Sequence, residues 1–188
     1  MAQAKTLTQA ELDQVLRYVS TKKYPERDRA LLMTSFLAGL RVAEIASLTM
    51  GDVLNIDGTV KAEVRLSAEQ TKGKYPRTVF LSSKLRAELA EYLETRNIKY
   101  PDIPLFHTNT RLRFTANSLC QWFYHTYRNA GISGASSHSG RRNFLTSLAS
   151  KGVGVRVLAA LAGHRNIAVT MKYIDASDDM KRNAVELI

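Results

Sequence analysis

Several short motifs along this chain hold side chains that are suited to chemistry on a phosphate group. The segment GLRVAE places Arg41 and Glu44 three residues apart, on one face of a helix, where they can form an ion pair. The segment HSGRR places His138 and Arg141 three residues apart at the start of a helix, whose exposed backbone amides favour an anion. Each motif alone also has a plain structural explanation, as a salt bridge in the first case and as a helix cap beside a solvated arginine in the second.

The segment LAGHRNIAVTMKYID places His164 and Tyr173 nine residues apart. On one uninterrupted helix the two side chains would lie on opposite faces, about 13 Å apart along the axis. However, Gly163 sits where a left-handed C-terminal cap belongs, and Asn166 sits where the next helix would begin. We therefore expect the chain to turn here, which would allow His164 and Tyr173 to converge, and whether they form one site depends on the other motifs.

The turn segment TKGK contributes Lys72 and Lys74, one on each side of a glycine. A lysine at a hairpin tip is most often simply solvated, so this motif gains weight only from the others. Together the motifs supply two arginines, two histidines, a lysine and a tyrosine. Phosphoryl transfer needs a nucleophile, positive groups around the non-bridging oxygens and an acid for the leaving oxygen, and this set fills each role without a metal.

Charge is distributed unevenly along the chain, which has 27 Lys and Arg against 17 Asp and Glu and a net charge of +10. Residues 103–174 contain no Asp or Glu but nine Lys and Arg. Such a composition suits a polyanion, with nucleic acid as the first candidate and ordinary solvated cations as the alternative. A two-magnesium nuclease needs clustered carboxylates, so the lack of acids in this stretch of sequence argues against that mechanism.

The elements that must position these residues follow from periodicity and from helix start and stop signals. Thr8 and Glu11 predict a capping box for a helix that runs to about Val19, and a second helix begins near Pro25 and stops at Gly39. Between about 53 and 81, strand-like segments flank TKGKYP and predict a small antiparallel sheet with a hairpin. Further helices are expected at 41–48, 83–96, 115–130, 139–151, 155–162, 167–173 and 178–187. The predicted fold is mainly α with a small antiparallel β-sheet (α+β).

Composition also limits the setting in which the chain works. Its 188 residues, 45% of them hydrophobic, suffice for one domain with a substantial core. The longest low-polarity stretch is about half as long as a membrane span, and the N-terminus lacks the apolar run of a secretion signal, so no membrane partner is expected. The single cysteine, Cys120, fits a reducing compartment and lies among apolar neighbours, which predicts packing. We expect a cytoplasmic protein.

The order and spacing of the motifs resemble the tyrosine recombinase (lambda-type integrase) family. GLRVAE, TKGK, HSGRR, AGHRNI and TMKYID follow one another in that family's order, and the match runs from LTQAEL to the helix after the tyrosine. A lone H-x-x-R motif is weak, but five ordered motifs are specific. The resemblance implies the family's mostly α catalytic domain with a small β-sheet, which agrees with the elements predicted above.

The resemblance also implies a role for each matching residue. Tyr173 would attack a DNA phosphodiester, form a 3′-phosphotyrosine bond and release a 5′-hydroxyl, with neither metal nor ATP as a cofactor. Arg41 and Arg141 would grip the non-bridging oxygens through hydrogen bonds that strengthen as charge develops. His164 would add a further donor to the phosphate.

Other matching residues would act around that phosphate. Lys72 would protonate the leaving 5′-oxygen, and it is preferred over Lys74 because the family's catalytic lysine often stands before the glycine. His138 would help to move the tyrosine proton. Glu44 would orient Arg41 rather than touch DNA. Further contacts with DNA are expected from Lys74, Arg142 and Arg165.

The resemblance implies partners and a domain organisation as well. The substrate would be double-stranded DNA with specific recombination sites, in a bacterial, phage or mobile-element setting, with accessory DNA-bending proteins as further partners. The C-terminal segment 177–188 would either dock on a neighbouring protomer, which links a homo-tetramer on DNA, or pack in cis. Residues 1–188 are expected to be a single catalytic domain without the family's N-terminal core-binding domain. Binding should then be weaker and more salt-sensitive than in two-domain relatives.

Two other functions fit parts of the pattern. A type IB topoisomerase would share the cleavage chemistry but rejoin the same strand after relaxing the DNA, and a non-catalytic regulator would bind DNA with vestigial residues. Small size and the HSGRR motif favour recombination over relaxation. The presence of all six chemical groups argues against a regulator.

Overall fold

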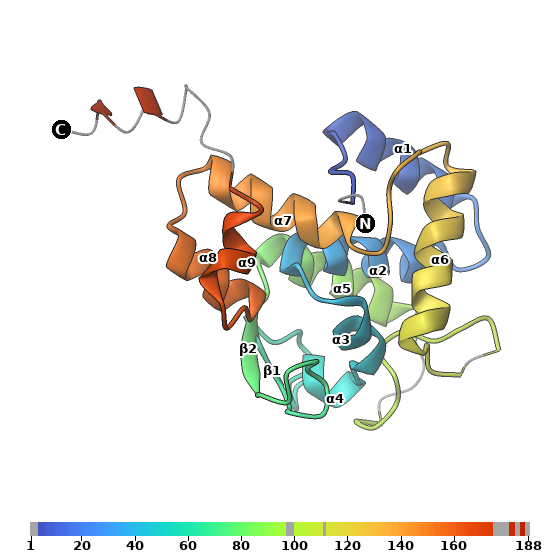
Figure 1. Ribbon diagram of the computed structural model, residues 1–188. Coiled ribbons are helices and arrows are strands. Elements are labelled where there is room, and N and C mark those ends of the chain that lie inside the picture. Colours follow the sequence, from blue (N-terminus) through green and yellow to red (C-terminus); the bar gives the residue numbers. More distant parts are fainter. Residues whose placement is uncertain (1–3, 97–99, 111, 175–180, 183–184, 187–188) are drawn as a thin grey trace.

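The computed structural model describes residues 4–96, 100–110, 112–174, 181–182 and 185–186 (Figure 1). Two antiparallel strands, β1 (Glu63–Leu66) and β2 (Arg77–Phe80), form a small sheet. The helices are α1 (Gln9–Ser20), α2 (Pro25–Ala38), α3 (Val42–Ser47), α4 (Met50–Val53), α5 (Ser83–Glu94), α6 (Ala116–Asn129), α7 (Ser139–Ser150), α8 (Val155–Ala162) and α9 (Ile167–Met171). The predicted fold class, mainly α with a small antiparallel sheet, is confirmed.

Helix α2 lies at the centre of the molecule, with α7 and α5 packed against it and α1 beside it (Figure 1). Ten of its 14 residues are buried, which explains why its sequence lacks a polar face. Helix α7 approaches α2 closely at Gly140, because a Cβ atom there would lie 2.8 Å from the Cβ of Ser35. This close approach fixes the beginning of α7 and hence the position of Arg141, the next residue.

The start and stop signals that the sequence shows for the first two helices are confirmed. Thr8 Oγ1 accepts a hydrogen bond from the Glu11 amide, and Glu11 Oε2 accepts one from the Thr8 amide, which completes the capping box of α1. Helix α2 begins at Pro25 and ends before Gly39, whose φ of +59° is left-handed. The chain then places Arg41 at the N-cap of α3.

The two strands are shorter than expected and are joined by a long loop, residues 67–76. They pair antiparallel with the buried Val64 opposite the buried Val79. Within the loop, the hydroxyl of Thr71 accepts a hydrogen bond from the amide of Tyr75 and donates one to its carbonyl. Both lysines of the TKGK motif therefore lie inside a loop that its own hydrogen bonds close.

Two boundaries differ from the sequence prediction. The sheet was expected from about residue 53, but helix α4 occupies this position, begun by Thr49, whose hydroxyl accepts from the Asp52 amide. Helix α9 ends at Met171 rather than at residue 173, so Tyr173 follows the helix in a turn. The helix expected at 178–187 falls largely outside the described residues.

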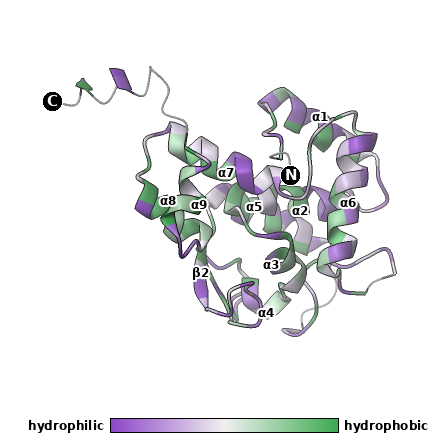
Figure 2. Ribbon diagram, viewed as in Figure 1, coloured by the Kyte–Doolittle hydropathy of each residue, from purple (hydrophilic) through white to green (hydrophobic). Residues whose placement is uncertain are grey.

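Apolar side chains fill the centre but also reach the surface of α8 and α9, where Figure 2 shows apolar ribbon. The large exposed apolar residues of these two helices are Val157, Ile167, Val169 and Met171. Cys120 on α6 is partly buried against the core, which confirms its expected packing role. Among the helices that the structure describes, none is long and apolar enough to cross a membrane.

Candidate active site

The chain turns sharply between α8 and α9, at residues 163–166. Gly163 ends α8 with a φ of +61°, in the left-handed region that a glycine adopts without strain. Asn166 begins α9, where its side-chain oxygen accepts a hydrogen bond from the Ala168 amide. The helix break predicted from the sequence is confirmed.

The turn brings His164 close to Tyr173. The centroids of the two rings lie 6.0 Å apart, and their planes are 22° from parallel. Arg142 adds a cation on the tyrosine, with its guanidinium carbon 5.8 Å from the centre of the Tyr173 ring. The sequence had predicted only a contact with DNA for Arg142, so this contact with the tyrosine was missed.

His164 lies between two partners that together fix the position of its proton. Its Nε2 lies 3.0 Å from Nη2 of Arg141, and its Nδ1 lies 2.9 Å from Oγ1 of Thr170. Because a guanidinium only donates, Nε2 accepts and the neutral ring carries its proton on Nδ1. Burial, followed by the positive charges of Arg141, Arg41 and Arg77, lowers the pKa of His164 to about 4. The imidazole is therefore neutral at neutral pH.

Arg141 is buried in the first turn of α7, and backbone carbonyls fix its guanidinium. Nη1 donates to the Gly39 carbonyl and Nη2 donates to the Ala162 carbonyl, each at 2.6 Å. Burial and the neighbouring charge of Arg41 lower the pKa of Arg141 to about 10, so the side chain stays charged at neutral pH. A guanidinium held in this way loses little conformational freedom when an anion binds.

Arg41 forms the ion pair with Glu44 that the sequence indicated. Its Nη1 donates to Oε1 of Glu44 at 3.1 Å, and its backbone amide donates to Oε2 at 2.8 Å. Its Nη2 lies 3.4 Å from the Gly163 carbonyl, directly before His164 in the chain. The Glu44 side chain is fully buried, whereas that of Arg41 is 25% exposed, so Arg41 can still reach a ligand.

Sequence reasoning missed Arg77, the first residue of β2. Its Nε and Nη2 donate to the two oxygens of Glu44 at 3.4 and 2.9 Å, and its Nη1 donates to the Leu161 carbonyl at 2.9 Å. Burial raises the pKa of Glu44, but hydrogen bonds and positive charge from Arg77 and Arg41 outweigh it and hold that pKa below its usual value. Arg77 and Glu44 are 33 residues apart, so no local spacing links them. The available signal was an arginine at the start of an apolar strand.

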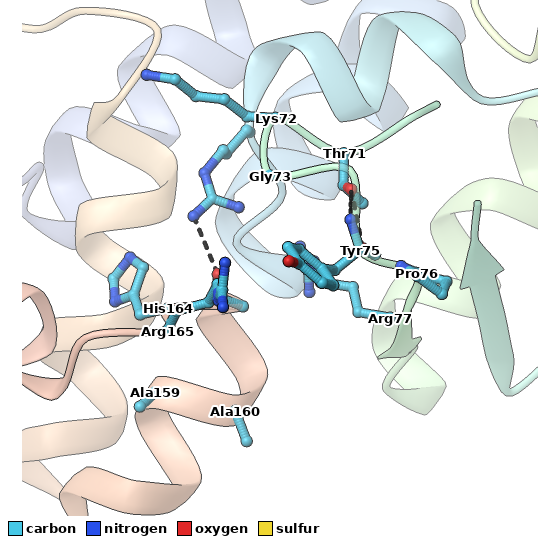
Figure 3. Close-up of a pocket in the computed structure, with 12 residues that line it drawn as sticks. Thr71, Lys72, Gly73, Tyr75, Pro76, Arg77, Ala159, Ala160, His164 and Arg165 are labelled. Atoms are coloured by element: carbon cyan, nitrogen blue, oxygen red, sulfur yellow. Dashed lines mark hydrogen bonds between the residues drawn. The ribbon is translucent and has the colours of Figure 1, made fainter. Parts of the chain in front are cut away.

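A pocket of about 370 Å³ opens between the β1–β2 loop and the turn after α8 (Figure 3). Lys72 belongs to the wall that the loop forms, and His164 belongs to the opposite wall. Arg165 joins the two walls, because its guanidinium carbon lies 4.3 Å from the centre of the Tyr75 ring. Lys74 is exposed in the same loop, with a φ of +53°. Of the two lysines in the motif, Lys72 is therefore the one that lines the pocket.

His138 occupies the N-cap position of α7, but its side chain makes no capping hydrogen bond with any residue that the structure describes. Partial burial and the positive charges of Arg141, Arg41 and Lys72 lower the pKa of His138. The imidazole therefore stays neutral at neutral pH and able to accept a proton. In the described part of the chain, no three His, Cys, Asp or Glu side chains gather as metal ligands would.

Solved structures that share this fold include a recombinase and an integrase. The XerA recombinase crystal structure has a TM-score of 0.77 and 21% identity, and the match covers 100% of this chain and 64% of that one. The Tn1549 transposon integrase in complex with circular intermediate DNA has a TM-score of 0.75 and 19% identity, covering 99% and 67%. At these identities the likeness shows a common fold.

The sequence comparisons define the family. The model of the phage integrase family matches residues 5–180, so the chain belongs to the phage integrase family. The tyrosine recombinase XerC of Pelobacter propionicus is 29% identical over 174 residues, which cover 90% of this chain and 55% of that protein. The chain thus spans little more than half the length of such curated relatives. The resemblance to tyrosine recombinases found in the motifs is confirmed.

Proposed function

We propose that residues 1–188 form the catalytic domain of a tyrosine-type site-specific recombinase, which cleaves and rejoins DNA through a 3′-phosphotyrosine intermediate. The observation that carries this proposal is the convergence of His164 and Tyr173, whose ring centroids lie 6.0 Å apart. The carbonyls of Ala162, at the end of α8, and of Gly163, at the start of the turn, accept hydrogen bonds from Arg141 and Arg41. Positive donors and a nucleophile on neighbouring segments would suit attack on a phosphodiester. Relatives that are named tyrosine recombinases support the proposal.

In the proposed cleavage step, the Tyr173 hydroxyl oxygen bonds to the phosphorus as the bond to the 5′-oxygen breaks. His138 accepts the tyrosine proton, since its lowered pKa leaves it neutral. Lys72 gives a proton to the departing 5′-oxygen. Arg41 and Arg141 donate to the non-bridging oxygens, where negative charge grows. A 5′-hydroxyl of a second strand then attacks the phosphotyrosine, so the bond energy is retained and the reaction needs neither metal nor ATP.

His164 takes part through a change in its hydrogen bonding. In the DNA-free chain its Nε2 accepts from Arg141, so it must gain a proton, or transfer the one on Nδ1, before it can donate to a phosphate. The bound phosphate would offset the cations that lower the pKa of His164 to about 4, and would therefore favour the protonated ring. Glu44 stays out of the chemistry and orients Arg41 through their 3.1 Å ion pair.

The proposed substrate is duplex DNA with specific recombination sites, in the cytoplasm. The Tn1549 integrase, which shares the fold, is precedent for DNA binding. Exposed Arg165 and Lys74 beside the pocket would contact the DNA backbone. We also propose a homo-tetramer on DNA, linked through residues 177–188 and assisted by accessory DNA-bending proteins, with packing of that segment in cis as the alternative.

Nicked suicide substrates test the proposed function. A pool of nicked duplexes with randomised sequence on both sides of the nick traps cleavage, because the short 5′-hydroxyl fragment diffuses away and cannot be rejoined. The wild-type chain should form an SDS-stable adduct with DNA, and the Tyr173→Phe variant should form none. Tyr75→Phe is the matched control, since Tyr75 lines the pocket and could be an alternative nucleophile. It should react like the wild type.

The other outcomes of this experiment point to other functions. An adduct that persists in Tyr173→Phe, or that disappears in Tyr75→Phe, would assign the nucleophile elsewhere. Failure of the wild type to form an adduct with any part of the pool would contradict catalysis and favour the non-catalytic regulator. Relaxation of supercoiled plasmids that lack partner sites would favour type IB topoisomerase activity.

A further inference from the structure

Arg77 links three elements around the pocket. It begins β2, it donates to both oxygens of Glu44 on α3, and it donates to the Leu161 carbonyl at the end of α8. It also packs beneath the turn, because a Cβ atom at Gly163 would lie 2.7 Å from Cδ of Arg77. The Arg77 side chain is only 12% exposed, so water screens these contacts poorly.

The C-terminal end of α8 gathers positive charge. Three consecutive carbonyls there accept hydrogen bonds from three different arginines: Leu161 from Arg77 at 2.9 Å, Ala162 from Arg141 at 2.6 Å and Gly163 from Arg41 at 3.4 Å. The last carbonyls of a helix carry partial negative charge, which favours cations at this end. They hold together guanidinium groups that would otherwise repel one another.

The charge on this cluster depends on Arg77. Glu44 forms ion pairs with both Arg41 and Arg77, so these three side chains together keep one net positive charge. Without Arg77, Arg41 and Glu44 would form a neutral pair. The carboxylate oxygens that Arg77 occupies would then be free to draw Arg41 inward, away from a phosphate in the pocket.

We propose that Arg77 is a positioning residue for strand cleavage: it neutralises Glu44, so that the charge of Arg41 is available to the phosphate, and it fixes the turn that carries His164. Arg77 acts through Glu44 and through the Leu161 carbonyl. The part of this inference that concerns cleavage rests on the proposed function. The part that concerns His164 can be measured on the DNA-free chain.

The kinetic test compares Arg77→Met with the double variant Arg77→Met/Glu44→Gln. Arg77→Met should slow the first-order formation of the suicide-substrate adduct by about tenfold or more, with duplex affinity changed less than about threefold. The double variant should recover part of the rate, because removing both charges restores the net positive charge carried by Arg41, although the ion pair that orients Arg41 is lost. If Arg77 were only structural, the double variant would be as slow as Arg77→Met or slower.

Two further variants control for folding and for the loss of an arginine. Arg29→Met removes a comparable arginine, which binds Glu88 through two hydrogen bonds of 2.6 and 2.7 Å between α2 and α5. It should react at the wild-type rate. Arg77→Lys keeps the charge and should react faster than Arg77→Met, which keeps the test decisive if the methionine variant folds poorly.

The second readout is the titration of His164, followed by NMR on the DNA-free chain. Positive charge from Arg77 contributes to the low pKa of His164, about 4, along with burial and the charges of Arg141 and Arg41. The pKa of His164 should therefore rise in Arg77→Met and stay near the wild-type value in Arg29→Met. If Arg77 held the fold together without an electrostatic effect on His164, the pKa of His164 would be the same in Arg77→Met as in the wild type.

The outcomes separate this inference from the proposed function. If the wild type forms no adduct, the proposed function fails, and the His164 titration still decides whether the charge of Arg77 acts on His164. If the wild type reacts, then a wild-type rate in Arg77→Met, a double variant without recovery, or an unmoved His164 titration would each overturn the inference.

Discussion

At the scale of single residues, the hydrogen bonds at the turn and the nearby arginines together determine the protonation state of His164. Arg141 donates to one ring nitrogen and Thr170 accepts from the other, so the folded chain binds the neutral ring with a defined tautomer. A protonated ring would lose the bond from Arg141 and face three arginines. The site therefore resists protonation until a negative group enters, which suits a residue that meets a phosphate.

The neutral state of His164 predicts how the free energy of unfolding depends on pH. An unfolded histidine titrates near pH 6.5, whereas burial and the nearby arginines lower the pKa of folded His164 to about 4. Between these values the unfolded chain binds more protons, so the free energy of unfolding should fall as the pH falls from about 6.5 to 4. Urea unfolding at several pH values measures this slope.

Two variants identify the residue responsible for that slope. His164→Gln should flatten it, and a smaller slope should remain because the pKa of His138 is lowered as well. His125→Gln, an exposed position on α6, serves as the control and should keep the wild-type slope. An unchanged slope in His164→Gln would contradict the assignment.

At the scale of elements, the α8–α9 turn determines which side chains meet. Gly163 contributes in two ways: its φ of +61° redirects the chain, and its lack of a side chain leaves room for Arg77. Gly152, after α7, also has a positive φ, +80°, but an added Cβ would meet nothing within 4 Å among the described residues. Substitutions at the two glycines therefore distinguish the effect of backbone strain from the effect of contact with Arg77.

Alanine at each glycine tests this distinction. Gly152→Ala should lower the free energy of unfolding by about 1 kcal/mol through left-handed strain alone. Gly163→Ala should cost more, because the new Cβ would lie 2.7 Å from Arg77 Cδ, and it should also slow adduct formation. Urea unfolding and the suicide-substrate assay measure the two effects. Equal losses of stability with full activity in both variants would show that the contact with Arg77 is unimportant.

The elements also show how far the sequence can predict the site. The caps of α1, α2, α8 and α9 follow from residues within a few positions of each helix end, and the structure confirms them. Arg77 could not be found in this way, because its partners lie 33 and 84 residues away. The end of α9 before Tyr173 was missed for a related reason, since no stop signal stands there and helix ends are the least certain boundaries.

At the scale of the whole molecule, the acid-free stretch from 103 to 174 supplies both site residues and surface charge. Its exposed cations in the structure include Arg113, Arg128, Arg156, Arg165 and Lys172. Since neighbouring acids in the sequence do not offset them, they favour a polyanion. Counterion release would then provide much of the binding free energy for a duplex.

This charge predicts a steep salt dependence of duplex binding. Affinity should fall strongly between about 50 and 200 mM salt, and Arg165→Gln, beside the pocket, should reduce the slope of log K against log salt by about 1. Lys22→Gln, on the turn between α1 and α2, is the control and should leave the slope unchanged. Fluorescence anisotropy with a labelled duplex measures both. Tight binding that is independent of salt would contradict this account.

The central claim is that Tyr173 becomes covalently joined to DNA. The most direct measurement is mass spectrometry of the adduct after digestion with nuclease and protease. We predict a nucleotide attached through its 3′-phosphate to the peptide that contains Tyr173. A nucleotide on Tyr75 or on any other residue would contradict the claim.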